Sequence, residues 1–262
     1  MKQAYDIVIL AGQSNAEGCG VGDVEQEYIP DERICALHAE MTVEHRPDNV
    51  YIQFADKPFV LSVAKEKESD GKKYGNFSLT FGKEYVENGC LKNGRKLLIV
   101  RIGVGGTGFY KKQWGLQDIL YKKMIEMVDY ALSLNTENKV VALLWHQGEH
   151  DAFEGTPPKA YGKQLAALIG DVRKRYGQIP FIAGDFVRDW KGKNISSCQP
   201  IVDEIRAVTQ TVGKAGFVET SDLPSNDEQT QNGDDIHFCR QSLHVLGRRY
   251  FAAYKEIANE RI

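Results

Sequence analysis

Short apolar runs rich in β-branched residues constrain the fold of this chain more than any other feature of its sequence. The runs span residues 5–11, 96–104, 139–145 and 179–183, and a weaker one spans residues 216–220. Runs of this length, without regular polar alternation, are typical of strands that are buried on both faces of a sheet. We therefore expect these segments to form the buried strands of one sheet.

Helix-like periodicity occupies most of the stretches between these runs. The pattern predicts helices over residues 79–87, 118–134, 158–176, 200–212 and 241–259. Strands that alternate with helices favour an α/β fold, in which a parallel sheet is covered by helices on both faces. A mixed α+β domain is the alternative that this pattern leaves open.

Residues 19–78 depart from this alternation. They contain several glycines and prolines, short apolar pieces and the charged stretch 65–73. A connection of this length inside a compact domain is usually functional or partly disordered. We predict a single domain over residues 1–262, with a long irregular insertion at about 19–78 that shapes one wall of the substrate site.

The amino-acid composition argues against several classes of protein. A chain of 262 residues is long enough for one large domain with a full core. Its 33 basic and 36 acidic side chains nearly balance, which gives no electrostatic reason to expect a nucleic acid or an anionic membrane as partner. The five cysteines include no CxxC pair, and their odd number argues against a disulfide framework and against a structural zinc site.

The first residues bear on where the protein works. Residues 1–6 lead directly into the first apolar run, without the charged leader and long apolar segment of a signal peptide. No run approaches the length of a membrane-spanning helix. The chain as printed is therefore expected to be cytoplasmic, whereas removal of a leader would be compatible with secretion.

The distinctive motifs of the sequence lie where predicted strands end. Residues 12–15, 103–108 and 145–151 each follow a strand, and residues 233–238 precede the last helix. In a doubly wound sheet, the loops at the carboxyl ends of the strands form the ligand crevice. We expect these four loops to meet at one crevice.

Ser14 is the first candidate for chemistry. A serine in a tight turn after a strand is most often a helix N-cap, whose hydroxyl accepts a backbone N–H. It becomes a nucleophile only with a base in reach, and His237 is a candidate base. Asp234, three residues before His237, can project from the same turn and hold the imidazole tautomer. Asp235 should then point to solvent or cap the following turn.

The glycine-rich loop at residues 103–108 admits two interpretations. A phosphate cradle would need a GxGxxG that opens a helix or a following GK[ST], and the sequence has neither. Glycines also let backbone N–H groups approach a developing oxyanion closely, as acyl transfer requires. The second interpretation agrees with a nucleophilic Ser14.

The third loop offers a rival chemistry. His146, Glu149 and His150 match the H-x-x-E-H pattern, which would make the chain a zinc-dependent hydrolase. That pattern needs both histidines on one helical face, but this stretch follows a buried strand and contains Gly148. We therefore predict no metal ligands here and no cofactor.

Together these motifs resemble the SGNH hydrolase superfamily, and more closely its sialate O-acetylesterase and acetylxylan esterase branch, carbohydrate esterase family 6. The matching blocks are Gly12-Gln13-Ser14-Asn15, Gly105-Gly106-Thr107, Trp145-x-Gln147-Gly148-Glu149-x-Asp151 and Asp234-x-x-His237. They span residues 12–237 in the expected order. The resemblance implies a three-layer α/β/α, flavodoxin-like fold and a metal-independent serine esterase.

The resemblance also implies roles for individual residues. Ser14 would be the nucleophile, His237 the general base and then acid, and Asp234 its orienting carboxylate. The oxyanion would be bound by the backbone N–H groups of Ser14 and Gly106 and by the side chain of Gln147.

Further residues of the matching blocks would have supporting or substrate-binding roles. They are Gln13, Asn15, Gly105, Trp114 and Glu149. Glu149 and Asp151 would brace the loops. Gln13 and Gln147 stand where the wider superfamily has Asp and Asn, as they do in the carbohydrate esterase branch.

An acetylated carbohydrate is the substrate that the resemblance implies, either acetylxylan or another plant hemicellulose, or a sialate O-acetyl ester. Phe109, Tyr110 and Trp114 follow the glycine loop and are candidates for stacking on a sugar ring, although core packing explains them equally well. A non-catalytic carbohydrate-binding protein on the same fold is a further alternative. The combination of Ser14, His237 and Asp234 argues against it, because binding alone would not require all three together.

Overall fold

The computed structural model describes residues 2–55 and 59–259, which include a seven-stranded sheet. The strand order is β11-β10-β9-β1-β8-β2-β5, and all neighbours are parallel except β2 and β5. The strands are β1 (Ala4–Gly12), β2 (Ile34–His38), β5 (Val60–Val63), β8 (Arg95–Gly103), β9 (Lys139–His146), β10 (Phe181–Gly184) and β11 (Ala215–Val218). The five strands predicted from the apolar runs are all present, and the α/β fold class is confirmed.

The central strand shows why the apolar runs lack polar alternation. All nine residues of β1 are buried. Ile7 and Ile9 pack into the core on one face of the sheet, whereas Val8 and Leu10 pack into the core on the other. Since successive side chains of a strand point to opposite faces, a strand covered on both sides is apolar throughout.

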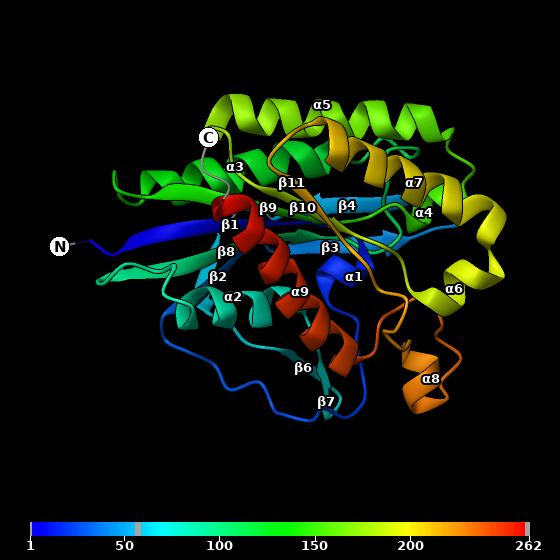
Figure 1. Cartoon of the computed structure of the whole chain (residues 1–262), viewed down its shortest axis with the longest axis horizontal. Helices are drawn as coiled ribbons and strands as arrows, with labels where there is room; N and C mark the ends of the chain where they lie inside the picture. Colours follow the sequence, from blue (N-terminus) through cyan, green and yellow to red (C-terminus); the bar gives the residue numbers. More distant parts are fainter. Residues whose placement is uncertain (1, 56–58, 260–262) are drawn as a thin grey trace.

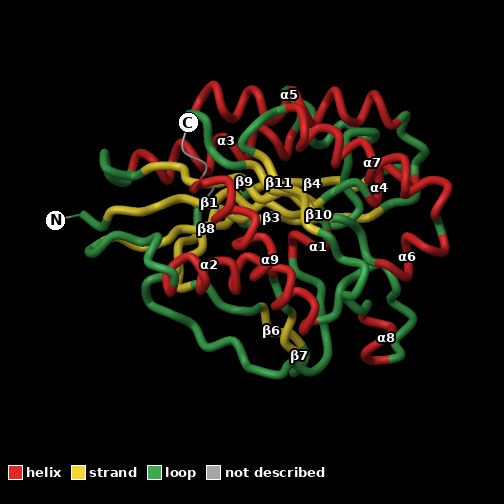
Figure 2. The backbone as a smooth tube through the Cα atoms, in the orientation of Figure 1, coloured by secondary structure: helices red, strands yellow, loops and turns green. Residues whose placement is uncertain are grey.

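Helices cover both faces of the sheet (Figure 1). α3 (Ile119–Ser133), α5 (Pro158–Tyr176) and α7 (Ile195–Thr211) cover one face, and α2 (Phe77–Glu87) and α9 (Arg240–Asn259) cover the other. Short helices lie toward the carboxyl ends of the strands (Figure 2), namely α1 (Ser14–Glu17), α4 (Glu149–Phe153), α6 (Arg188–Lys193) and α8 (Asn226–Thr230). The three-layer α/β/α arrangement is therefore confirmed.

The start of α7 differs from the prediction. The sequence pattern suggested a start at Pro200. The helix instead begins at Ile195 and contains Pro200 in its interior. Cys198 and Ile201 are both buried in the core, so packing of this face offsets the backbone hydrogen bond that proline cannot make.

The insertion at residues 19–78 is not irregular throughout, and this expectation was wrong. Its described part contains six strands, of which β2 and β5 extend the main sheet. The others form two hairpins, β3 (Met41–His45) with β4 (Val50–Phe54) and β6 (Lys67–Ser69) with β7 (Lys72–Tyr74). These hairpin strands are short and largely exposed, so they lack the continuous apolar pattern by which buried strands were recognised.

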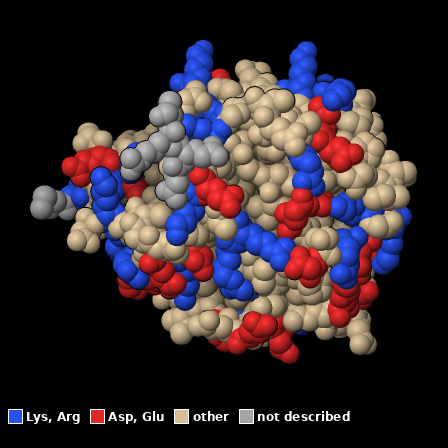
Figure 3. Space-filling model, viewed as in Figure 1, with Lys and Arg blue, Asp and Glu red and all other residues tan. Residues whose placement is uncertain are grey.

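The surface shows the near balance of charges that the composition implies. Lys and Arg are interspersed with Asp and Glu over the face seen in Figure 3. Within the described residues, no helix has both the length and the apolar character needed to cross a membrane.

A buried ion network joins the insertion to the last helix. Arg240, at the start of α9, is only 4% exposed and donates through Nε and Nη2 to Glu66, at 3.0 and 2.5 Å. His244 lies 2.9 Å from the same carboxylate, and Glu27 accepts from Arg240 at 2.7 Å. Although burial opposes ionisation, hydrogen bonds from His244 and Arg240 lower the pKa of Glu66. The position of the insertion therefore depends on a paired, buried charge.

Replacing Arg240 with Met should lower the free energy of unfolding by about 3 kcal/mol, because the buried Glu66 carboxylate loses its main counter-charge. Urea denaturation followed by circular dichroism measures this loss. Glu27→Gln is the matched control, since the Glu27 side chain is 55% exposed and its replacement should change the midpoint little. Equal losses in the two variants would contradict a special role for the buried pair.

Candidate active site

The turn from β1 into α1 presents Ser14. Gly12 has a φ of +147°, and a Cβ added there would lie 2.0 Å from the carbonyl oxygen of His146. The next residue, Gln13, donates its backbone N–H to that same oxygen at 3.0 Å. This close approach of β1 and β9 requires glycine and turns the chain sharply.

Ser14 is the first residue of α1 and not its N-cap. The N-cap is Gln13, and no side chain caps this end of the helix. The N-cap interpretation of Ser14 is therefore wrong. Ser14 is 7% exposed, and its hydroxyl makes no hydrogen bond with any residue in the ranges 2–55 and 59–259.

Asn15 holds the loop of His237 beside Ser14. Its Oδ1 accepts the backbone N–H of Phe238 at 3.1 Å, and its Nδ2 donates to the carbonyl oxygen of Ile236 at 3.2 Å. Both backbone neighbours of His237 are thus bound by the residue that follows Ser14. The fully buried amide of Asn15 therefore sets the distance between the first and last of the four loops.

The carboxylate of Asp234 binds the imidazole of His237. Its two oxygens lie 2.9 and 2.8 Å from Nδ1. Asn226, on α8, donates its Nδ2 to Asp234 at 2.8 Å. Burial opposes ionisation, but the bonds from His237 and Asn226 lower the pKa of Asp234. With Nδ1 bound to a carboxylate, Nε2 is the ring nitrogen left for Ser14.

Asp235 points away from this pair. Its Oδ2 accepts from Nζ of Lys193, at the end of α6, at 2.8 Å. It neither faces only solvent nor caps the next turn, as the sequence had suggested, because α6 brings a lysine to it. The structure thus separates the two adjacent carboxylates, Asp234 toward His237 and Asp235 toward the surface.

The glycine loop after β8 lies against Ser14. A Cβ added at Gly105 would be 3.4 Å from the Cβ of Ser14. The backbone N–H of Gly105 donates to Oε2 of Glu17 at 3.0 Å. By contrast, the backbone N–H groups of Ser14 and Gly106 meet no acceptor in the described part of the chain. Of the two glycines, only Gly106 therefore offers a free donor.

The side chain of Gln147 is bound within the protein. Its Nε2 donates to Oδ2 of Asp151 at 2.7 Å and lies 3.2 Å from the carbonyl oxygen of Thr107 and 3.4 Å from Oε1 of Gln13. Gln13 Oε1 also accepts the backbone N–H of His150 at 3.1 Å. Gln13 and Gln147 thus connect the first, second and third loops to each other.

Asp151 braces the glycine loop from the third loop. It is fully buried and accepts from the backbone N–H groups of Phe109 and Tyr110, both at 2.9 Å. Thr156 also donates to it through Oγ1 at 2.7 Å. Together with Gln147, these donors satisfy a carboxylate that burial would otherwise make costly.

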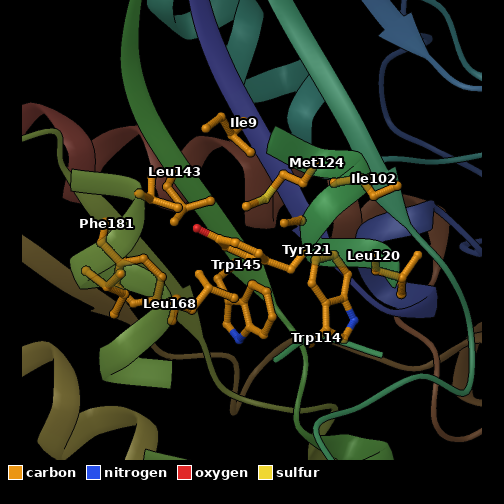
Figure 4. Close-up of a cluster of buried hydrophobic side chains, with 14 of the residues drawn as sticks. Ile9, Ile102, Trp114, Leu120, Tyr121, Met124, Leu143, Trp145, Leu168 and Phe181 are labelled. Carbon is orange, nitrogen blue, oxygen red and sulfur yellow. The ribbon is translucent and has the colours of Figure 1, made fainter. Parts of the chain in front are cut away.

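Two of the aromatic residues considered for sugar stacking are part of the core. Trp114 is fully buried and Phe109 is 3% exposed, so neither can contact a sugar ring. Trp114 packs edge-on against Trp145 (Figure 4), and its Nε1 donates to Oγ1 of Thr107. Its role is therefore to support the glycine loop. Tyr110, which is 49% exposed, remains available to a ligand.

The zinc pattern of the third loop does not form the helix that it needs. His146 is the last residue of β9, whereas Glu149 and His150 belong to α4. The ring of His146 faces Tyr250, and the ring of His150 stacks on Phe153. No group of three or more His, Cys, Asp or Glu side chains in residues 2–55 and 59–259 is placed to hold a metal ion.

Three residues at this site were missed by sequence reasoning. His45, on β3, has its Nε2 3.0 Å from the carbonyl oxygen of Gly105. Asn226 binds Asp234, and Glu17 binds the backbone of Gly105. His45 lies in the segment taken as irregular, and Asn226 lies in no motif, so no sequence signal identified them. Glu17 follows Ser14 by three residues, a spacing that could have suggested it.

The sequence of this chain is similar to those of known proteins. A model of a carbohydrate esterase family, described as sialic acid-specific acetylesterase, matches residues 4–256. Over 180 residues the chain is 26% identical to a protein of Arabidopsis thaliana named as a probable carbohydrate esterase, covering 64% of this chain and 62% of that protein. The chain thus spans less than two thirds of that relative's length.

Solved structures show the same fold. The crystal structure of NanS matches with a TM-score of 0.74 and 18% identity, covering 99% of both chains. The Arabidopsis thaliana protein matches with a TM-score of 0.67 and 20% identity, covering 96% of this chain and 98% of its own. A carbohydrate acetylesterase from Xanthomonas citri matches with a TM-score of 0.62 and 17% identity, covering 98% of this chain and 57% of its own.

The two adjacent carboxylates should differ sharply in their effect on ester hydrolysis. Asp234→Asn leaves the imidazole without its carboxylate and should lower kcat for p-nitrophenyl acetate by a factor approaching about 10⁴. Asp235→Asn removes only a surface pair with Lys193 and should cost less than about tenfold. Both variants are compared at one pH, with circular dichroism as a check of folding. A larger loss in the Asp235 variant would contradict this assignment.

Proposed function

Because the chain belongs to the carbohydrate esterase family described as sialic acid-specific acetylesterases, we propose that it removes O-acetyl groups from sugars through an acyl-enzyme on Ser14. The observation that carries this proposal is the bonding of Asn15 to both backbone neighbours of His237. These bonds hold the imidazole of His237, which is bound to the Asp234 carboxylate, beside Ser14. That is the pairing of base and nucleophile that ester hydrolysis needs.

In the first half of the reaction, Nε2 of His237 takes the proton from Ser14 as Oγ attacks the acetyl carbonyl carbon. The imidazolium then returns this proton to the sugar oxygen as the C–O bond breaks, which leaves an acetyl group on Ser14. In the second half, His237 takes a proton from water as the water oxygen attacks the acetyl-serine. The imidazolium then returns this proton to Oγ of Ser14 as the bond between Oγ and the acetyl carbon breaks and acetate leaves. Asp234 stabilises the imidazolium in both halves. The hydrogen bond between Oγ and Nε2 forms when the substrate is bound.

The negative oxygen of the tetrahedral intermediate needs donors that are free in advance. The backbone N–H groups of Ser14 and Gly106 meet this need, since no described residue accepts from them. Gln147 is the third proposed donor. Its Nε2 carries two hydrogens, of which Asp151 takes one at 2.7 Å, and the longer contacts to Thr107 and Gln13 are those that an oxyanion would replace.

A cavity of about 500 Å³ lies beside α1, and neither Ser14 nor His237 is among its lining residues. Glu17, Gly103 and Arg101 are among its lining residues. Arg101 Nη2 donates to the carbonyl oxygen of Glu17 at 3.1 Å, and its guanidinium is a cation suited to a sugar carboxylate. Because the family is described as sialic acid-specific, we place sialates first among the acetylated sugars to be tested, with acetylated xylan and mannan as neutral comparisons.

Replacing Ser14 with Ala should abolish acetate release from the best sugar of this panel and lower kcat for p-nitrophenyl acetate by about 10⁴ or more. Ser196→Ala, at an exposed position on α7, is the control and should behave as the wild type. Mass spectrometry after rapid quenching should detect an acetyl group on Ser14. A Ser14→Ala protein that keeps a tenth of the activity would overturn the proposal, as would loss of activity on dialysis against a strong chelator.

Gln147→Ala should lower kcat by about 10²–10³ with little change in KM, because one oxyanion donor is typically worth about 2.7–4 kcal/mol in the transition state. The control is Gln210→Ala, an exposed glutamine on α7, which should change neither constant. Steady-state kinetics on p-nitrophenyl acetate separate the two constants. A change confined to KM would instead make Gln147 a residue that binds the ground-state substrate.

A further inference from the structure

Two buried polar side chains, His146 and Glu149, face each other behind Asn15. His146 and Glu149 are both fully buried, and Nε2 of His146 lies 3.6 Å from Oε1 of Glu149. Within the described residues, His146 Nε2 and Glu149 Oε2 have no hydrogen-bond partner. Buried polar atoms are almost always hydrogen-bonded, so this pair requires an explanation.

Tyr250 determines which nitrogen of His146 carries the hydrogen. Its hydroxyl donates to the carbonyl oxygen of Trp145 at 2.9 Å, which uses the only hydrogen of that group. The contact of 3.0 Å between Tyr250 and Nδ1 of His146 therefore needs the histidine to donate. Nε2 is then a bare acceptor, and it points toward a carboxyl group.

An ionised Glu149 would place acceptor against acceptor in a site without water access, which costs free energy. A single proton between the two groups removes the conflict. We propose that Glu149 is held as a neutral carboxylic acid that donates a hydrogen bond to Nε2 of His146, and that this pair positions Asn15. Because Oε1, 3.6 Å from Nε2, already accepts from Asn15, the donor to Nε2 is Oε2, the oxygen without a partner, and a rotation of the carboxyl group brings it into place.

The surroundings of Glu149 support a neutral carboxyl. Burial raises the pKa of Glu149 and the nearby Asp185 adds to the rise, while the bond from Asn15 and the charge of His237 act against it. Burial lowers the pKa of His146 to about 3, so the proton of the pair belongs to Glu149. The titratable groups that face Glu149 are His146 on β9, Tyr161 on α5, Asp185 after β10, Cys198 on α7, His237 before α9 and Tyr250 on α9.

The pair acts on the catalytic loop through Asn15. Oε1 of Glu149 accepts from Nδ2 of Asn15 at 2.9 Å, and the same Nδ2 donates to Ile236. Glu149 therefore fixes the orientation of the amide that holds His237. Glu149 is a positioning residue, and its kinetic effect rests on the proposed function, whereas its protonation state does not.

Glu149→Gln is the informative variant, because an amide reproduces the hydrogen-bonding groups of a protonated carboxyl. Its NH₂ donates to His146, and its oxygen accepts from Asn15. We expect Glu149→Gln to keep kcat within about threefold of the wild type. Glu149→Ala should lower kcat by about tenfold or more, because His237 would then be displaced from its catalytic position. A Gln variant as impaired as the Ala variant would overturn the proposal, since it would mean that the charge is needed.

The second measurement uses stability and does not involve an ester. Since the pKa of Glu149 is raised by folding, the neutral group stabilises the fold below its unfolded pKa, and this contribution is lost as pH rises through the folded value. The Tm of the wild type should therefore match that of Glu149→Gln in acid and fall below it as pH rises. The proposal would be contradicted if the Tm difference between the two proteins did not change with pH, or if the Tm of the wild type rose relative to that of the variant as pH increased.

Infrared difference spectra report directly whether the carboxyl group of Glu149 is protonated. The wild type minus Glu149→Gln at neutral pH should contain the C=O stretch of a protonated carboxylic acid, and its absence would overturn the proposal. If the wild type released no acetate from any sugar, the proposed function would be wrong. The infrared spectra and the melting curves would still determine the protonation state of Glu149. The two failures are thus distinguishable.

Discussion

The amide of Asn15 is the interaction on which the candidate site depends. It joins the turn after β1 to the loop before α9, two segments separated by more than 200 residues, and to Glu149 of the third loop. Each loop alone is an irregular segment with no reason to hold a fixed distance from the others. Because the amide is fully buried, its hydrogen bonds are not exchanged for water, and the geometry of Ser14 and His237 follows from them.

Five of the seven strands of the main sheet were predictable because burial on both faces leaves a signal in the sequence, whereas β2 and β5 lie in the segment expected to be irregular. β1, β8 and β9 are apolar over most of their length. The hairpins β3–β4 and β6–β7 leave no such signal. Their strands exist because partner strands and the rest of the insertion are in place, and exposed side chains on them are free to be polar.

The candidate site was predictable to the extent that its residues fall at strand ends. The motifs pointed to Ser14, Asp234 and His237 as candidates. Because their loops follow strands or precede the last helix, the sequence predicted that they lie at one edge of the sheet. The contacts between loops were not predictable, since the bonds of Asn226 to Asp234 and of His45 to Gly105 depend on tertiary position. For Trp114 the sequence left sugar stacking and core packing open, and the structure places it in the core.

The stretch His146 to His150 shows that the backbone conformation decides what the same residues can do chemically. On a continuous helix, His146 and His150 would share one face and suit a metal. Here β9 ends at His146 and α4 begins at Glu149, so Gly148, with a φ of +142°, turns the chain between them. The turn sends His150 outward and leaves His146 facing Glu149 in the core. What remains is a buried histidine next to a buried carboxyl group, and one proton shared between them removes the conflict between two acceptors.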